Sequence, residues 1–131
     1  MTGYIGSIEK QTGKNNYFRK VLFTGEHAQL VVMCLKPGEE IGNEVHPHVD
    51  QFFRIEHGKA RFVFNGKENH LAGDGDGVIV PAGTFHNVIN VSKTAKLKLY
   101  TIYSPSNHPD GTVHKTKAAA ERAELLKHKK N

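Results

Sequence analysis

Between residues 18 and 99 the chain alternates short apolar runs with glycine, proline or asparagine, and this rhythm is typical of an all-β sandwich or barrel. The runs predict strands at residues 19–23, 29–36, 44–46, 51–57, 60–64, 69–72, 77–80, 86–90 and 96–103. Asn65-Gly66 predicts a tight hairpin turn, because both central residues of a type I′ turn need a positive φ.

After residue 103 the pattern changes. Residues 104–111 form a turn-rich connector, and residues 116–129 place Ala119, Ala123 and Leu126 along one stripe. The stripe predicts a short C-terminal helix that lies on the barrel or frays when free. We therefore divide the chain into a barrel domain, residues 1–111, and a basic helical tail, residues 112–131.

The charge of the chain is concentrated in that tail. The net charge is +5, and residues 112–131 carry six basic side chains against Glu121 and Glu124, which leaves +1 on the remaining residues. A basic end on a nearly neutral body is typical of a solvated terminus. We therefore expect no nucleic-acid partner.

Cysteine content and hydropathy bear on the compartment. Cys34 is the only cysteine, so no intramolecular disulfide can form, and a reducing compartment is favoured. The first thirty residues contain no apolar stretch long enough for a signal peptide or a membrane span. These features predict a cytoplasmic protein without a membrane partner. Cys34 lies in an apolar run and is expected to be buried and inert.

Two glycine-bounded segments, residues 38–58 and 75–90, carry histidine on or beside predicted strands. Alternate side chains of a strand share a face, so Glu44 and His46 are expected to project together. Gln51 follows after a turn, and His86 must come from across the barrel. Their nitrogen and oxygen atoms are expected to converge on a site that the rigid sheet positions in advance.

The first segment resembles cupin motif 1, which reads Gly, five residues, His, one residue, His, three or four residues, Glu, six residues, Gly. Here the same spacing reads Gly38, Glu44, His46, Gln51 and Gly58. The second segment resembles cupin motif 2 at every defined position, through Gly75, Pro81, Ala82, Gly83, His86 and Asn90. The resemblance implies a double-stranded β-helix, or jelly roll, with one metal ion in its open end. Small cupins of similar sequence are loosely described as related to mannose-6-phosphate isomerase.

Two departures from motif 1 alter the implied ligand set. Glu44 replaces the first histidine and Gln51 replaces the glutamate. The carboxylate is therefore supplied by residue 44 instead of residue 51, and the total charge of the ligands stays at minus one. We expect one divalent transition metal, namely Fe, Mn, Ni, Co or Zn, bound by Glu44, His46, Gln51 and His86. In an alternative register the paired histidines are His46 and His48, but only the first register matches both flanking glycines.

The resemblance favours a metal-dependent enzyme that acts on a small oxygen-rich molecule, a sugar or a keto or enol compound, by isomerase or dioxygenase chemistry. His48 is the candidate acid or base, and His108, Asp110 and His114 could belong to a lid formed by the connector. The alternative is a non-catalytic module that binds or senses a small molecule. A homodimer is expected, because an open barrel needs its sheet edges covered.

Overall fold

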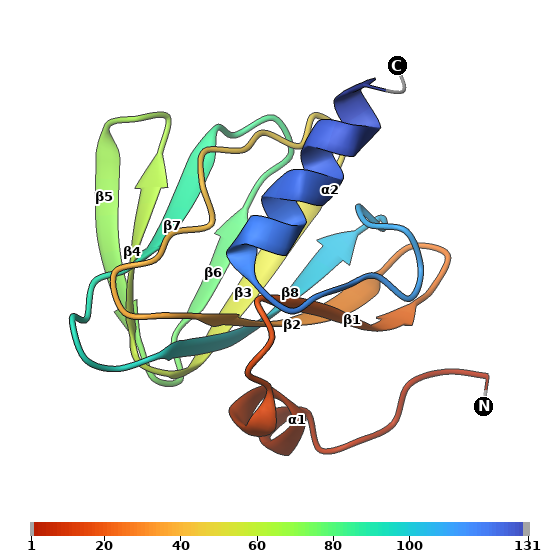
Figure 1. Ribbon diagram of the computed structural model, residues 1–131, viewed down its shortest axis with the longest axis horizontal. Coiled ribbons are helices and arrows are strands. Elements are labelled where there is room, and N and C mark those ends of the chain that lie inside the picture. Colours follow the sequence, from red (N-terminus) through yellow and green to blue (C-terminus); the bar gives the residue numbers. More distant parts are fainter. Residues whose placement is uncertain (1, 130–131) are drawn as a thin grey trace.

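Two antiparallel sheets form the body of the computed structural model, which describes residues 2–129 (Figure 1). The larger sheet has the strand order β6-β3-β8-β2-β1-β9, and the smaller has the order β5-β4-β7. The elements are α1 (Ile8–Lys14), β1 (Arg19–Thr24), β2 (Gln29–Leu35), β3 (Asp50–His57), β4 (Lys59–Phe64), β5 (Glu68–Gly73), β6 (Gly77–Val80), β7 (His86–Asn90), β8 (Leu97–Ser104), β9 (Val113–His114) and α2 (Lys117–Lys129). This architecture confirms the predicted all-β jelly-roll barrel with a short C-terminal helix.

Strands β1 to β8 lie where the apolar pattern predicts them, with each end shifted by no more than one residue. The predicted strand at residues 44–46 is wrong, because Glu44 forms only an isolated bridge with His86. Pro47 has no N–H to donate and restricts the residue before it, so this segment cannot continue as a ladder. It runs instead as a loop laid along β7.

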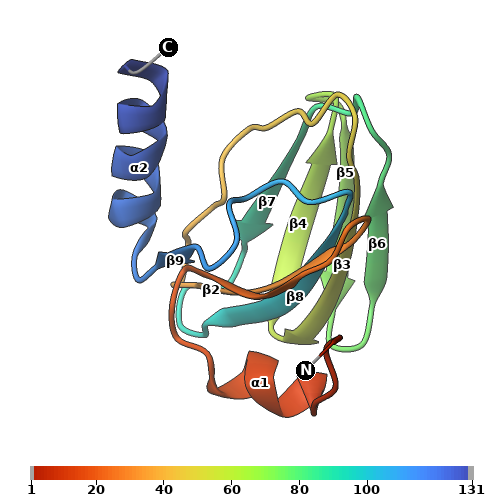
Figure 2. The same ribbon diagram turned by 90° about the vertical axis from the view of Figure 1, so that its right-hand side faces the viewer.

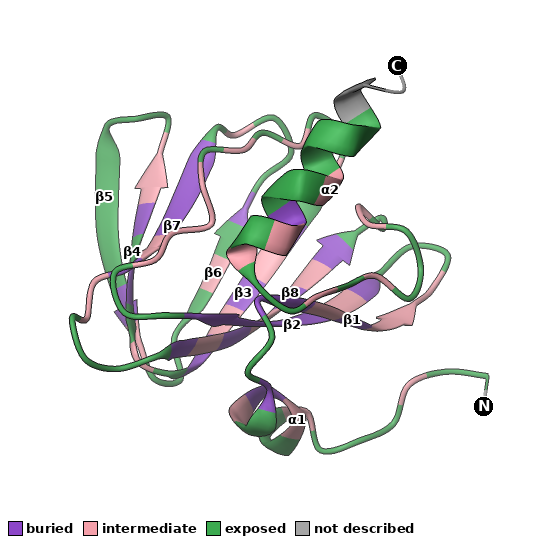
Figure 3. Cartoon of the chain, in the orientation of Figure 1, coloured by how far each residue is buried: buried purple, intermediate pink, exposed green. Residues whose placement is uncertain are grey.

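The interior changes character along the strands. At the end near Leu97 the inward side chains are apolar, and Ile55, Ala60, Leu97 and Leu99 are fully buried there. Toward the other end of β3 and β8 the inward positions become polar. Figure 3 shows buried residues alternating with less buried ones along β3 and β8, as expected when one face of each sheet covers the core.

Two turns depend on backbone conformations that glycine favours. Asn65 and Gly66 have φ of 54° and 71°, which confirms the predicted hairpin turn. Gly58 has φ of 107°, and a Cβ atom there would lie 2.9 Å from the carbonyl oxygen of Lys96. Gly58 therefore lets β3 turn into β4 directly against the start of β8.

Both helices lie outside the sheets. The apolar pattern does not reveal α1, which packs near β8, where Lys98 Nζ donates to the carbonyl oxygen of Gly13. Figure 2 shows α2 projecting beside the barrel, with Ala120 buried and Leu125 exposed. The predicted domain boundary after residue 111 falls just before β9, which pairs with β1. Among the described residues, no helix has the length and apolar character needed to cross a membrane.

Candidate ligand site at the barrel mouth

Buried polar side chains gather at one end of the barrel, which we call the mouth. β3 and β8 supply Gln51, Thr101 and Tyr103, which are 3%, 0% and 2% exposed. The smaller sheet supplies His86, the first residue of β7, which is 4% exposed. Polar side chains rarely fill a barrel interior without hydrogen-bond partners, so this end has the character of a binding site.

The loop before β3 brings Glu44 and His46 to the mouth. The Glu44 N–H donates to the carbonyl oxygen of His86, and the His86 N–H donates back to that of Glu44, both at 2.9 Å. The Gly83 N–H donates to the carbonyl oxygen of His46 at 2.9 Å. Asp50 accepts from the Ala82 N–H at 2.8 Å and so holds the same turn. The loop is therefore fastened to the second glycine-bounded segment by backbone hydrogen bonds.

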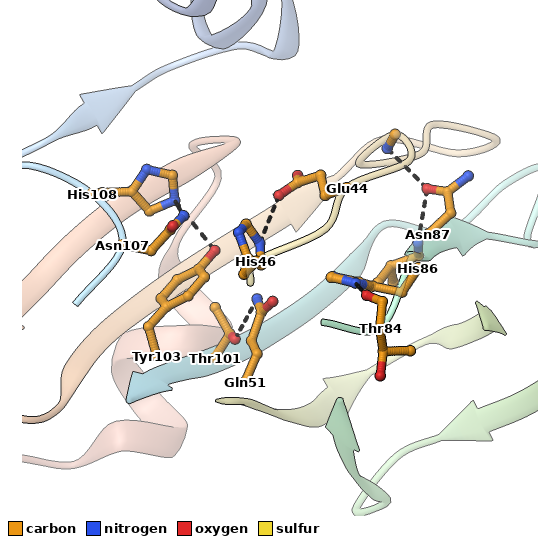
Figure 4. A network of polar contacts seen from close by, with 12 residues as sticks. Glu44, His46, Gln51, Thr84, His86, Asn87, Thr101, Tyr103, Asn107 and His108 are labelled. Carbon is orange, nitrogen blue, oxygen red and sulfur yellow. Dashed lines mark hydrogen bonds and ion pairs between the residues drawn. The ribbon is translucent and has the colours of Figure 1, made fainter. Parts of the chain in front are cut away.

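The side chains of Glu44, His46 and His86 face one another across this mouth (Figure 4). His46 Nε2 lies 3.0 Å from Glu44 Oε2, and the rings of His46 and His86 have centroids 5.5 Å apart. The structure thus brings together the two histidines that the motifs single out. It also favours the register with Glu44 and His46, because His48 is exposed.

The protonation of this group follows from its surroundings. Burial would raise the pKa of Glu44, but the adjacent His46 imidazole and the charge of Arg19 outweigh it and lower that pKa. Burial lowers the pKa of His86. His86 Nδ1 lies 2.9 Å from the Thr84 carbonyl oxygen, to which it donates, so the lone pair is on Nε2. At neutral pH the mouth therefore holds a carboxylate and a neutral imidazole.

Two atoms of the predicted ligand residues are buried without a hydrogen-bond partner. Gln51 Nε2 donates to Thr101 Oγ1 at 3.0 Å, whereas Gln51 Oε1 has no donor. His46 Nε2 is close to Glu44 but lacks the geometry of a hydrogen bond. Unsatisfied buried polar atoms are rare in folded proteins, and each signals a missing ligand, ion or water.

These residues were tested against the metal ion that the cupin motifs imply. Within residues 2–129 no three His, Cys, Asp or Glu side chains are arranged to hold a metal ion. The chemistry of the donors nevertheless fits a divalent transition metal, with imidazole nitrogens, one carboxylate and an amide oxygen. The two unpartnered atoms, His46 Nε2 and Gln51 Oε1, are both of kinds that bind such an ion. In this structure Glu44 Oε2 and His46 Nε2 instead contact each other at 3.0 Å.

A second polar group at the mouth joins His108 and His114, which the sequence suggested only as lid residues, to Arg19 and Tyr103, which sequence reasoning missed. Tyr103 links it to the first, since its ring is edge-on to His46 at 5.9 Å and to His108 at 5.2 Å between centroids. His108 Nε2 lies 3.2 Å from the Tyr103 hydroxyl. The sequence held one signal for this group. Arg19 is a charged residue two positions before the apolar Val21, so both side chains lie on the inward face of the strand.

The connector after β8 folds back against the barrel. Gln29, which is fully buried, accepts hydrogen bonds from the Asn107 and His108 N–H groups and donates to the His108 carbonyl oxygen. These bonds place the His108 ring on Tyr103, whereas Asp110 is exposed. The connector therefore contributes one histidine to the mouth through a fixed backbone.

Two surface hollows lie elsewhere. One of about 290 Å³ is lined by residues of β4, β5 and β6, and another of about 310 Å³ by residues of α1, β1 and β2. Neither contains the buried titratable groups described above. The chemistry therefore favours the mouth as the functional site.

Comparisons with known proteins agree with this architecture. Residues 31–103 match the family described as Cupin domain. The chain is 49% identical over 126 residues to the uncharacterized protein YrkC of Bacillus subtilis, covering 92% of this chain and 67% of that protein. It is 47% identical over 113 residues to the uncharacterized protein L612 of Acanthamoeba polyphaga mimivirus, covering 84% and 70%. The crystal structure of BH2720 from Bacillus halodurans is similar with a TM-score of 0.88 and 43% identity, covering 91% and 93%.

Proposed function

Because the chain belongs to the cupin family, we propose that its barrel mouth holds a divalent transition metal ion and binds a small oxygen-rich molecule there. The ion would be held by Glu44, His46, Gln51 and His86. One observation carries the proposal: His46 Nε2 and Gln51 Oε1 are both buried at the mouth with no hydrogen-bond partner. A bound ion would satisfy both atoms at once.

The chain's own groups are suited to this role. The Glu44 carboxylate supplies negative charge, and the neutral His86 offers one ring nitrogen because Thr84 holds the other. Thr101 fixes the Gln51 amide with its oxygen free. When bound, the ion would supply Lewis-acid polarisation of a carbonyl group and chelation of neighbouring oxygens. The proposed acid or base is His48, which is exposed on the loop that also carries Glu44 and His46.

Metal analysis of purified protein tests the ligand assignment. We expect nearly stoichiometric metal in the wild type and a large loss in both Glu44→Ala and His86→Ala. His70→Ala is the matched control, because His70 is exposed on β5 and should leave the metal content unchanged. If both mouth variants keep the full metal content, the assignment is wrong.

Loading with metal under anaerobic conditions, followed by assays of oxygen uptake and sugar isomerisation, separates the two reaction classes. Oxygen uptake that requires metal and a keto or enol substrate supports dioxygenase chemistry. Interconversion of sugars without oxygen supports isomerase chemistry. Activity in neither assay across a broad panel of substrates would contradict an enzymatic role.

A non-catalytic binding module is the second candidate, and the ion pair between Glu44 and His46 favours it. In this arrangement the carboxylate and the imidazole contact each other directly, 3.0 Å apart, without a metal. Calorimetric titration with small molecules in the presence of EDTA distinguishes the candidates. A binding module would retain its affinity without metal, whereas a metal-dependent enzyme would lose it.

A further inference from the structure

Arg19 places a cation inside the barrel. It is the first residue of β1, where its backbone pairs with Met33 on one side and His114 on the other. The arginine is only 7% exposed, and it alternates with the buried Val21, so its side chain points inward. Arginine is almost never buried to this extent without a partner, because removing its charge from water is costly.

The guanidinium of Arg19 lacks an anionic partner. In the described part of the chain no carboxylate forms an ion pair with it, and its Nε is buried with no hydrogen-bond partner. Its Nη1 lies 3.2 Å from Nδ1 of His114, and its central carbon lies 5.2 Å from the centroid of the Phe18 ring. A neutral imidazole and an aromatic face hold the guanidinium in position but do not neutralise it.

The groups around this cation are neutral. Burial, followed by the charge of Arg19, lowers the pKa of His108 to about 3 and also lowers the pKa of His114. The Tyr103 hydroxyl, which lies 3.2 Å from His108 Nε2, completes these surroundings. The Glu44 carboxylate contacts His46, and no ion pair joins it to Arg19. One positive charge with an open donor is thus surrounded by neutral polar groups.

We propose that Arg19 binds a carboxylate group of the small molecule that occupies the mouth, with the Tyr103 hydroxyl and His108 forming the polar wall beside it. The proposal rests on the proposed function, since the rest of the same molecule would extend past Tyr103 toward His46. A carboxylate matches a single guanidinium in charge and shape. A phosphate group, with nearly two negative charges, would be undercompensated by this single guanidinium. The substrate class narrows from sugars and keto or enol compounds in general to organic acids.

Titration with malonate at constant low ionic strength tests the proposal. Binding is measured by calorimetry, and the Arg19 Nε–H signal is followed by nuclear magnetic resonance. We expect the Nε–H signal to shift and Arg19→Gln to weaken malonate binding by about 10- to 100-fold, because a hydrogen bond to a charged group is lost. Arg19→Lys keeps the charge, so its affinity for malonate should lie between those of the wild type and Arg19→Gln. Arg61→Gln changes an exposed arginine of β4 and should bind like the wild type.

Repeating the titration with EDTA separates this proposal from metal binding. Malonate binding that survives EDTA and is lost in Arg19→Gln supports the carboxylate site even if no metal binds. Malonate binding that is lost with EDTA but unchanged in Arg19→Gln would leave the metal proposal standing and overturn this one. Absence of malonate binding, or equal binding of inorganic phosphate or glucose, would also overturn it. If Arg19→Gln does not fold, two other measurements test the proposal. A shift of the wild-type Arg19 Nε–H signal on addition of malonate, with weaker malonate binding by Arg19→Lys, supports it, and absence of both overturns it.

Discussion

The amide of Gln51 is held in one orientation by Thr101, because Gln51 Nε2 donates to Thr101 Oγ1 at 3.0 Å from the neighbouring strand. Both side chains are buried, and the bond leaves Gln51 Oε1 without a donor. A neutral amide is a weak metal ligand unless its oxygen is aimed in advance. Thr101 would therefore support the proposed metal site by holding the Gln51 amide in place.

Thr101→Val should weaken metal binding while leaving the fold intact. Valine has nearly the shape of threonine but cannot accept the hydrogen bond, so the Gln51 amide becomes free to turn. Loss of such a supporting contact typically lowers metal affinity about 10- to 100-fold. Competition with a chelator of known affinity measures the change. Thr94→Val, at an exposed position, is the control, and equal affinities for the two variants would contradict the role of Thr101.

The spacing of the motifs predicts that His46 and His86 come together, because this spacing depends on strand period and turn chemistry, which are local properties. His46 and His86 meet as expected, although Glu44 lies on a loop rather than a strand. Arg19 and His108 could not be placed in the same way. They reach the mouth through the pairing of β1 with β9 and through Gln29, and these contacts join residues far apart in the chain. Sequence periodicity holds no information about such pairings.

Asn90 shows that a motif residue can be structural. Its Nδ2 contacts the carbonyl oxygens of Leu35, Lys36 and Ala95, and its Oδ1 accepts from the Ser92 N–H. The side chain is 1% exposed and lies at the far end of β7 from His86. It satisfies backbone groups where three segments of the chain meet, which explains its presence in motif 2 without a ligand role.

Asn90→Ala is therefore expected to destabilise the protein by about 3 kcal/mol, because several buried polar groups lose their partner. Urea denaturation measures the free energy of unfolding. The metal content of the folded variant should equal that of the wild type. Asn69→Ala removes an exposed amide and should change stability little, and a loss of metal in folded Asn90→Ala would contradict the structural assignment.

The free energy of unfolding should decrease as the pH falls, because His108 is held neutral in the folded protein. Its pKa is lowered from 6.5 in the unfolded chain to about 3 in the folded protein, mainly by burial. Between these values the unfolded chain binds a proton that the folded protein does not, so acidification favours unfolding. The contribution is fully present above pH 6.5 and decreases by at most about 1.4 kcal/mol per pH unit below it.

His108→Gln removes this contribution and should flatten the dependence of the unfolding free energy on pH between 5 and 6.5. Urea denaturation at several pH values gives the slope. His27→Gln changes an exposed histidine and should keep the slope of the wild type. If the slopes of His108→Gln and the wild type coincide, His108 is not held neutral by burial.

Arg19→Met should make the protein more stable and abolish its response to malonate. The buried guanidinium lacks an anionic partner, and methionine fills similar space without a charge, so we expect the free energy of unfolding to rise by about 1–4 kcal/mol.

Malonate should raise the melting temperature of the wild type, since a ligand that binds only the folded state stabilises it. It should not raise that of Arg19→Met. Arg61→Met, at an exposed position, should match the wild type in both measurements. Lower stability of Arg19→Met would instead mean that the contacts of Arg19 with His114 and Phe18 hold the barrel together, and that the cation is part of the scaffold rather than of a binding site.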